Sequence, residues 1–152
     1  WYAARTEDRP RSRGLRLGQG LSLAIIVITT AMIGLSVLRG AGADGERDLA
    51  WNTLGASVLI LVIGGFLGRV PPNPAIGVRT HWNYKSRLAW DRSNRLVGRL
   101  LFWLGLAGLP LGLLAPAAVA LPVLIIAILI AAAWSVFESW RVWRTDPDRQ
   151  PF

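Results

Sequence analysis

Cysteine is absent from this sequence, and histidine occurs once, as His81. Without cysteine the chain has no disulfide framework, no thiolate nucleophile and no cysteine-ligated metal site. The single histidine has no carboxylate neighbour that could complete a metal site with it. We interpret His81 as a polar surface residue and expect neither a metal ion nor any other cofactor.

Charge is scarce and unevenly distributed. Charged residues make up 17% of the chain, whereas a soluble domain usually has about 25%. No charged residue lies between Leu100 and Phe137. At about 1.5 Å per residue this run measures roughly 57 Å, nearly twice the thickness of the hydrocarbon core. We therefore expect it to fold back as a hairpin that turns at Ala115 and Pro116.

Four apolar stretches predict an all-α integral membrane bundle of four transmembrane helices. They cover about residues 17–38, 49–68, 97–114 and 117–140. The membrane domain, residues 17–140, follows a basic tail (1–16) and precedes a polar tail (141–152). We expect this second tail to be disordered beyond Thr145. Because the first residue is Trp1 rather than methionine, we expect a processed or truncated start.

The basic residues predict the orientation of the spans. The 1–16 tail, the 69–99 region and the 141–152 tail hold fifteen of the seventeen Lys and Arg residues. The two remaining loops hold only Arg39 and Arg47. Since cytoplasmic loops retain positive charge, we expect a multi-pass protein of the bacterial inner membrane with both termini cytoplasmic. The net charge of +8 is explained by these flanking residues, so we expect no nucleic-acid binding.

The stretch from Pro71 to Arg99 is the only long polar segment between the two apolar halves. Its three prolines prevent helix directly after the second span. Ser86 is a suitable cap for a helix that lies in the membrane interface and then turns into the third span. We expect Trp82 and Trp90 to anchor this cytoplasmic loop at the depth of the lipid headgroups.

Residues 76–95, IGVRTHWNYKSRLAWDRSNR, carry a recognisable pattern. It has a glycine, an apolar residue, Arg-Thr-x-Trp, a second tryptophan eight residues later, and Asn followed by Arg. This pattern resembles the SdpI family of small bacterial membrane proteins. The matching positions, with a further glycine frequent after them, are Gly77, Arg79, Thr80, Trp82, Trp90, Asn94, Arg95 and Gly98. His81 departs from the family, which usually has proline there.

The resemblance implies a non-enzymatic role in toxin immunity or membrane signalling. The family's founding member protects against a secreted peptide toxin and holds a repressor at the membrane. The expected partners are membrane lipids, other membrane proteins or a cytoplasmic regulator, and a peptide toxin. An alternative is a small accessory subunit packed on a larger membrane complex. An enzyme or transporter is disfavoured, because the spans have no ionisable residue away from their ends and no catalytic set is apparent.

Two readings of these residues remain open. The matching positions either fix the loop against the bilayer or form a surface that docks a partner. At the end of the second span, Gly64, Gly65 and Gly68 include a GxxxG spacing that allows close helix packing. The alternative is that glycine is simply common in membrane helices. At the end of the fourth span we expect Glu138 to pair with Arg141 or Arg144.

Overall fold

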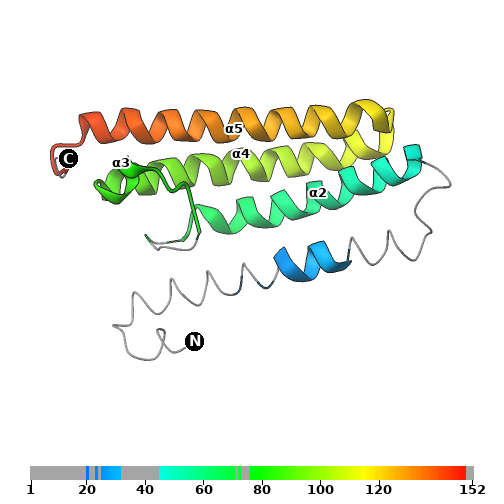
Figure 1. The fold of residues 1–152 in the computed structure, drawn as a ribbon, viewed down its shortest axis with the longest axis horizontal. Helices are drawn as coiled ribbons and strands as arrows, with labels where there is room; N and C mark the ends of the chain where they lie inside the picture. The colour runs from blue at the N-terminus through cyan, green and yellow to red at the C-terminus, as the bar shows by residue number, and fades with distance from the viewer. Residues whose placement is uncertain are drawn as a thin grey trace.

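In a computed structural model of the chain, the described residues are 20, 23, 25–31, 45–70, 72 and 76–149. All regular secondary structure among them is helical, as predicted (Figure 1). The elements are α2 (Gly45–Leu67), α3 (His81–Tyr84), α4 (Arg87–Leu114) and α5 (Ala117–Thr145). The predicted span over residues 17–38 lies mostly outside the described residues, although 25–31 are helical.

The three long helices lie side by side, with α4 between α2 and α5 (Figure 1). Ala115 caps the end of α4 and Pro116 the start of α5, so the predicted hairpin turn is confirmed. Within the described part of the chain, α2 from Arg47, α4 and α5 are each long and apolar enough to cross a membrane.

Two boundaries differ from those predicted. The polar stretch that follows Ser86 does not form a separate interfacial helix, because α4 runs without a break from Arg87 to Leu114. Ser86 is its cap, as predicted, and accepts a hydrogen bond from the N–H of Ala89 at 2.9 Å. α5 extends to Thr145, beyond the predicted end of the span at residue 140. Interface and span therefore share one helix in both cases, because no proline interrupts the backbone hydrogen bonds at either junction.

Small and polar side chains occupy many of the buried positions of the bundle, whereas many of the large apolar ones face outward. Thr53, Ser57 and Ser135 are fully buried, while Leu129 and Ile130 are each 63% exposed. The hydroxyl of each of these three polar residues donates to a carbonyl one turn earlier in its own helix. This arrangement suits lipid as the surrounding solvent, because helices in a bilayer associate through close packing and hydrogen bonds.

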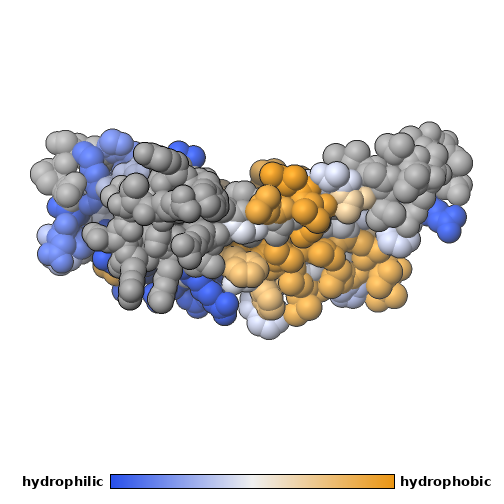
Figure 2. Space-filling model, turned by 90° about the horizontal axis from the view of Figure 1, so that it is seen from below, coloured by the Kyte–Doolittle hydropathy of each residue, from blue (hydrophilic) through white to orange (hydrophobic). Residues whose placement is uncertain are grey.

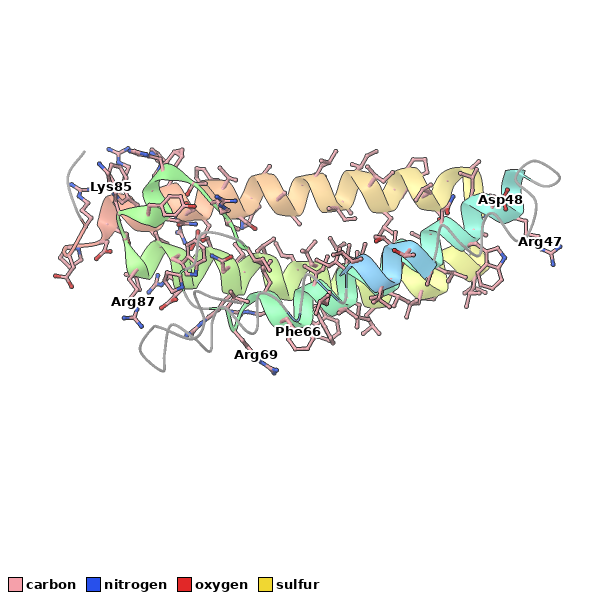
Figure 3. The ribbon with its side chains drawn as sticks, turned by 60° about the horizontal axis from the view of Figure 1, so that its bottom comes forward. Arg47, Asp48, Phe66, Arg69, Lys85 and Arg87 are labelled. Carbon is pink, nitrogen blue, oxygen red and sulfur yellow. The ribbon has the colours of Figure 1, made fainter. Side chains whose placement is uncertain are left out.

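Polar and apolar surfaces are separated along the bundle. Figure 2 shows hydrophilic residues gathered at one end and hydrophobic residues over the other part of the visible face. Figure 3 places Lys85, Arg87 and Arg69 at the end that carries the loop, and Arg47 with Asp48 at the opposite end. The bundle of described helices thus has charged residues toward both ends and an apolar middle, as expected of a membrane-spanning domain.

Candidate functional site

The loop that joins α2 to α4 contains a constrained glycine. Gly77 has a φ angle of +128°, which L side chains rarely adopt. A methyl group placed there would also lie 2.6 Å from Asn94 Oδ1 and 3.0 Å from the ring of Trp90. Both the backbone angle and the close approach of α4 therefore require glycine at this position.

Asn94 connects the loop to α4. Its side chain is 2% exposed, and its Oδ1 accepts a hydrogen bond from the N–H of Val78 at 2.9 Å. Its Nδ2 donates to the carbonyl of Trp90, one turn earlier in α4, also at 2.9 Å. The amide thereby satisfies a loop N–H and fixes the path of the loop over α4.

Trp90 is buried rather than placed at the membrane surface. Its side chain is 1% exposed, and its Nε1 donates to the carbonyl of Val70, just after α2, at 3.3 Å. The expectation that Trp90 anchors in the lipid headgroups is therefore wrong. Val70 and the loop glycine cover this ring from the α2 side, whereas Trp82 remains half-buried.

Two further polar residues, which the sequence pattern did not single out, complete the interior of the loop. Asn83 is buried, and its Nδ2 donates to the carbonyl of Val78 and to Ser93 Oγ, the latter at 3.0 Å. Ser93 is fully buried and donates to the carbonyl of Trp90 at 3.2 Å. A signal was present in the sequence: Ser93 lies three residues after Trp90 and next to Asn94, on the same side of α4.

The loop is also connected to α5. Thr80 caps α3 by accepting from the N–H of Asn83, and its Oγ1 lies 2.6 Å from Ser139 Oγ. Ser86 Oγ donates to Asp146 Oδ2, and Asp146 is 7% exposed. The expectation of disorder beyond Thr145 is therefore wrong at Asp146, because this carboxylate packs against the cap of α4. We call the half-buried Thr80 and the buried Asn83, Trp90, Ser93 and Asn94 the buried polar cluster.

A second group of loop side chains faces outward. Arg79 and His81 are exposed, and Arg79 Nε donates to the hydroxyl of Tyr84 at 3.0 Å. Trp82 and Lys85 are partly exposed. We call these five residues, Arg79, His81, Trp82, Tyr84 and Lys85, the loop surface.

The glycines at the end of α2 have different surroundings. A methyl group on Gly64 would lie 2.7 Å from the carbonyl oxygen of Gly98 and 2.8 Å from Phe102 Cα. One on Gly68 would lie 3.3 Å from the Cα of Arg95, whose own side chain is exposed. Gly65 does not share this role, because the space next to its Cα is open and the residue is exposed.

α4 adds glycines to this interface that the sequence analysis did not single out. A methyl group on Gly105 would lie 2.6 Å from the backbone N of Leu61 and from the carbonyl oxygen of Ser57. One on Gly108 would collide with Ser57 Oγ. Together with Gly98, these residues recur at spacings of seven and three, which places them on one side of a helix. That periodicity was readable in the sequence.

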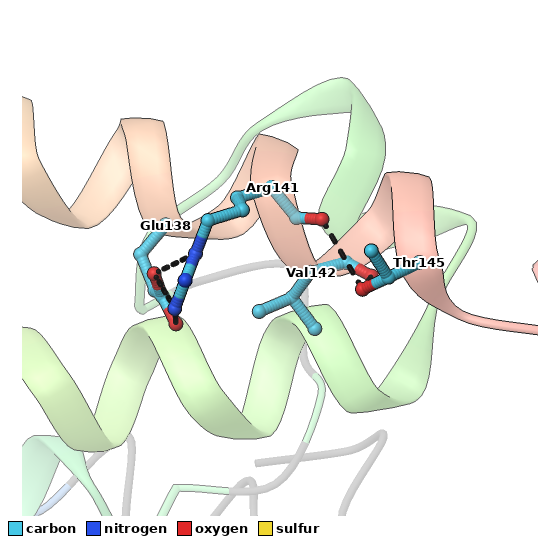
Figure 4. Close-up of polar contacts among 4 residues, drawn as sticks. All are labelled: Glu138, Arg141, Val142 and Thr145. Carbon is cyan, nitrogen blue, oxygen red and sulfur yellow. Dashed lines mark hydrogen bonds and ion pairs between the residues drawn. The ribbon is translucent and has the colours of Figure 1, made fainter.

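Charged groups at this end include one well-formed ion pair. Glu138 Oε2 and Oε1 accept hydrogen bonds from Arg141 Nε and Nη2 at 2.8 and 2.9 Å (Figure 4). Of the two predicted partners of Glu138, Arg141 is the one observed. Among the residues that the structure describes, no group of three His, Asp or Glu side chains could hold a metal ion. What the site offers is a fixed loop with outward-facing basic and aromatic groups, which suits binding.

Comparison with known proteins supports the resemblance seen in the sequence. No curated protein and no solved structure gives a significant match to this chain. The model of the SdpI/YfhL protein family, in contrast, matches residues 69–139. That range runs from the end of α2 to Ser139, and so contains every predicted motif residue together with the hydroxyl that meets Thr80. The match covers 71 of the 152 residues, less than half of the chain, and over this range the chain is similar to the SdpI/YfhL protein family.

Proposed function

We propose that this protein is a non-enzymatic, multi-pass membrane protein that docks a partner on the loop surface, in a toxin-immunity or membrane-signalling role. The observation that carries the proposal is the division of the motif into two groups. The buried polar cluster holds the loop in one conformation, and the loop surface presents an arginine, a lysine and aromatic side chains outward. A preorganised surface loses little conformational entropy on binding, and arginine and aromatic residues dominate binding energies at interfaces.

The distribution of charge supports a cytoplasmic position for this surface. The loop surface lies at the end of the bundle that holds Lys85 and Arg87 (Figure 3). By the retention of positive charge on the cytoplasmic side, both termini and this loop face the cytoplasm of a bacterial cell in the proposal. Because the chain has no cysteine, a single Lys85→Cys variant gives a clean test. Labelling of that cysteine by a membrane-impermeant reagent in intact cells would refute the orientation.

A survival assay tests the immunity role. Sensitive bacteria that express the protein are challenged with a panel of secreted apolar peptide toxins. We expect survival with the natural chain and its loss in an Arg79→Gln, Trp82→Ala double variant. The matched control is Arg47→Gln, an exposed arginine at the opposite end of the bundle, which should retain protection. If bacteria that express the protein stay as sensitive to every toxin as bacteria that lack it, the immunity role is contradicted. The signalling role is then tested by capture of a partner on the loop surface.

The second candidate is an accessory subunit of a larger membrane complex. It is favoured by Gly65, whose outward side is open, next to Phe66, which is 46% exposed on the same helix. A small residue at a helix surface lets another helix approach closely. Purification from native membranes in mild detergent should then recover a membrane partner in stoichiometric amount. A Gly65→Leu variant should lose that partner, whereas the double variant of the loop surface should keep it.

A further inference from the structure

A cleft separates the outer sides of α4 and α5 at the end of the bundle that carries the loop. Its volume is about 530 Å³. Its α4 wall consists of three arginines and a leucine, and its α5 wall of two aromatic residues and an ion pair. The lining residues are Arg92, Arg95, Leu96, Arg99, Trp134, Phe137, Glu138 and Arg141.

The charge in this cleft is unbalanced. Glu138 is its only acid, and both of its oxygens are engaged by Arg141. Within the described ranges, no carboxylate pairs with Arg92, Arg95 or Arg99. These arginines recur at spacings of three and four, so their side chains project from one side of α4. Their guanidinium groups are therefore available to an anion from outside the chain.

The depth of Arg99 sets this cleft apart from an ordinary basic membrane surface. Since α4 and α5 are joined only by Ala115 and Pro116, the two helices start from one level at the opposite end. From there the charge-free part of α5, residues 117–137, spans roughly 31 Å at 1.5 Å per residue, which matches a hydrocarbon core of about 30 Å. The charge-free part of α4, residues 100–114, spans only roughly 22 Å.

With the hairpin placed at one face of the hydrocarbon core, Arg99 therefore lies below the level at which α5 leaves that core, and it lines the same cleft as Trp134. A guanidinium at that depth is costly unless it extends toward the surface or meets a counter-anion. A phosphate is a suitable counter-anion, because arginine binds it through two parallel hydrogen bonds. Basic pockets between membrane helices are known to hold anionic headgroups.

We propose that this cleft binds one anionic phospholipid. The lipid phosphate is held between Arg95 and Arg99, Arg92 contributes a further positive charge nearer the surface, and the apolar part of the lipid begins beside Trp134. This inference concerns the α4–α5 cleft and does not depend on the partner proposed for the loop surface. The Glu138–Arg141 pair closes one side of the cleft without neutralising the other arginines.

Native mass spectrometry of the full chain in detergent tests this site, with phosphatidylglycerol and phosphatidylcholine as paired probes. We expect one retained phosphatidylglycerol and weak, unsaturable retention of phosphatidylcholine. Each basic group near an anionic lipid is worth a factor of about five in affinity. The double variant Arg95→Gln, Arg99→Gln should therefore weaken retention of phosphatidylglycerol by roughly 25-fold. Arg99→Lys should restore part of the affinity. Arg87→Gln, an exposed arginine at the same end but outside the cleft, is the matched control.

A titration with inorganic phosphate and glycerol phosphate separates a lipid site from a small-anion site. If either small anion displaces phosphatidylglycerol at millimolar concentration, the cleft binds a free phosphate and the lipid proposal is overturned. An equal loss of binding in Arg87→Gln would also overturn it, because attraction would then depend on net charge alone. Circular dichroism of each variant confirms that the helices are retained, so that lost binding reports on the cleft.

Discussion

The contact between α2 and α4 at Gly64 gives the sharpest prediction for stability. In a Gly64→Ala variant the new methyl group would lie 2.8 Å from Phe102 Cα and 2.7 Å from the carbonyl oxygen of Gly98. Carbon atoms pack at about 3.5–4.0 Å, so the Phe102 backbone would have to withdraw by roughly 0.7–1.2 Å. Because both obstructing atoms belong to a helix backbone, no side-chain rotation can relieve the clash.

Gly65→Ala is the matched control, because its methyl group meets open space on the same turn of the same helix. Both variants gain the same helix propensity, about 1 kcal/mol. Their difference in stability therefore isolates the packing clash, and overpacking of this kind costs about 1–3 kcal/mol. We expect Gly64→Ala to be less stable than Gly65→Ala by that amount.

The measurement is unfolding in mixed micelles, followed by tryptophan fluorescence and by circular dichroism, for the natural chain and both variants. A lower unfolding midpoint for Gly64→Ala, together with an unchanged or higher midpoint for Gly65→Ala, supports the observed helix contact. Equal stability of the two variants, to within about 0.5 kcal/mol, would show that α2 and α4 do not approach through these glycines.

Three further substitutions test the loop. Asn94→Ala leaves a buried loop N–H without its acceptor and should destabilise the fold by about 1–3 kcal/mol, whereas Asn52→Ala, at an exposed position on α2, should change little in the same unfolding assay. Ser86→Ala removes the cap of α4 and should cost about 0.5–2 kcal/mol; proteolysis should then cut the loop faster, and an unchanged cleavage rate would argue against the cap. Trp90→Phe removes one buried hydrogen bond, worth about 1 kcal/mol, and should also reduce the quencher-inaccessible part of the fluorescence. Trp103→Phe, at a side chain 63% exposed, should do neither.

The sequence predicted the elements whose cause is local. Absence of charge over Leu100–Phe137 determines long apolar helices, and Pro116 determines where the hairpin turns. The cap at Ser86 could also be predicted, since a serine side chain accepts a helix N–H wherever a helix starts after it. The family pattern likewise identified candidate site residues from the sequence alone, without their positions in the structure.

Only the tertiary structure decided what the motif residues do. Trp90 looked like an interfacial anchor because tryptophan is common at headgroup depth, yet its burial depends on Val70, twenty residues earlier, whose carbonyl accepts its N–H. Thr80 contacts Ser139 of α5, and Asp146 accepts a hydrogen bond from Ser86, the cap of α4. No local sequence pattern predicts these contacts. Local preference determines helices and turns, whereas the side that a residue presents depends on which helix packs against it. In this bundle that packing turned half of the loop pattern inward and left its basic groups facing outward.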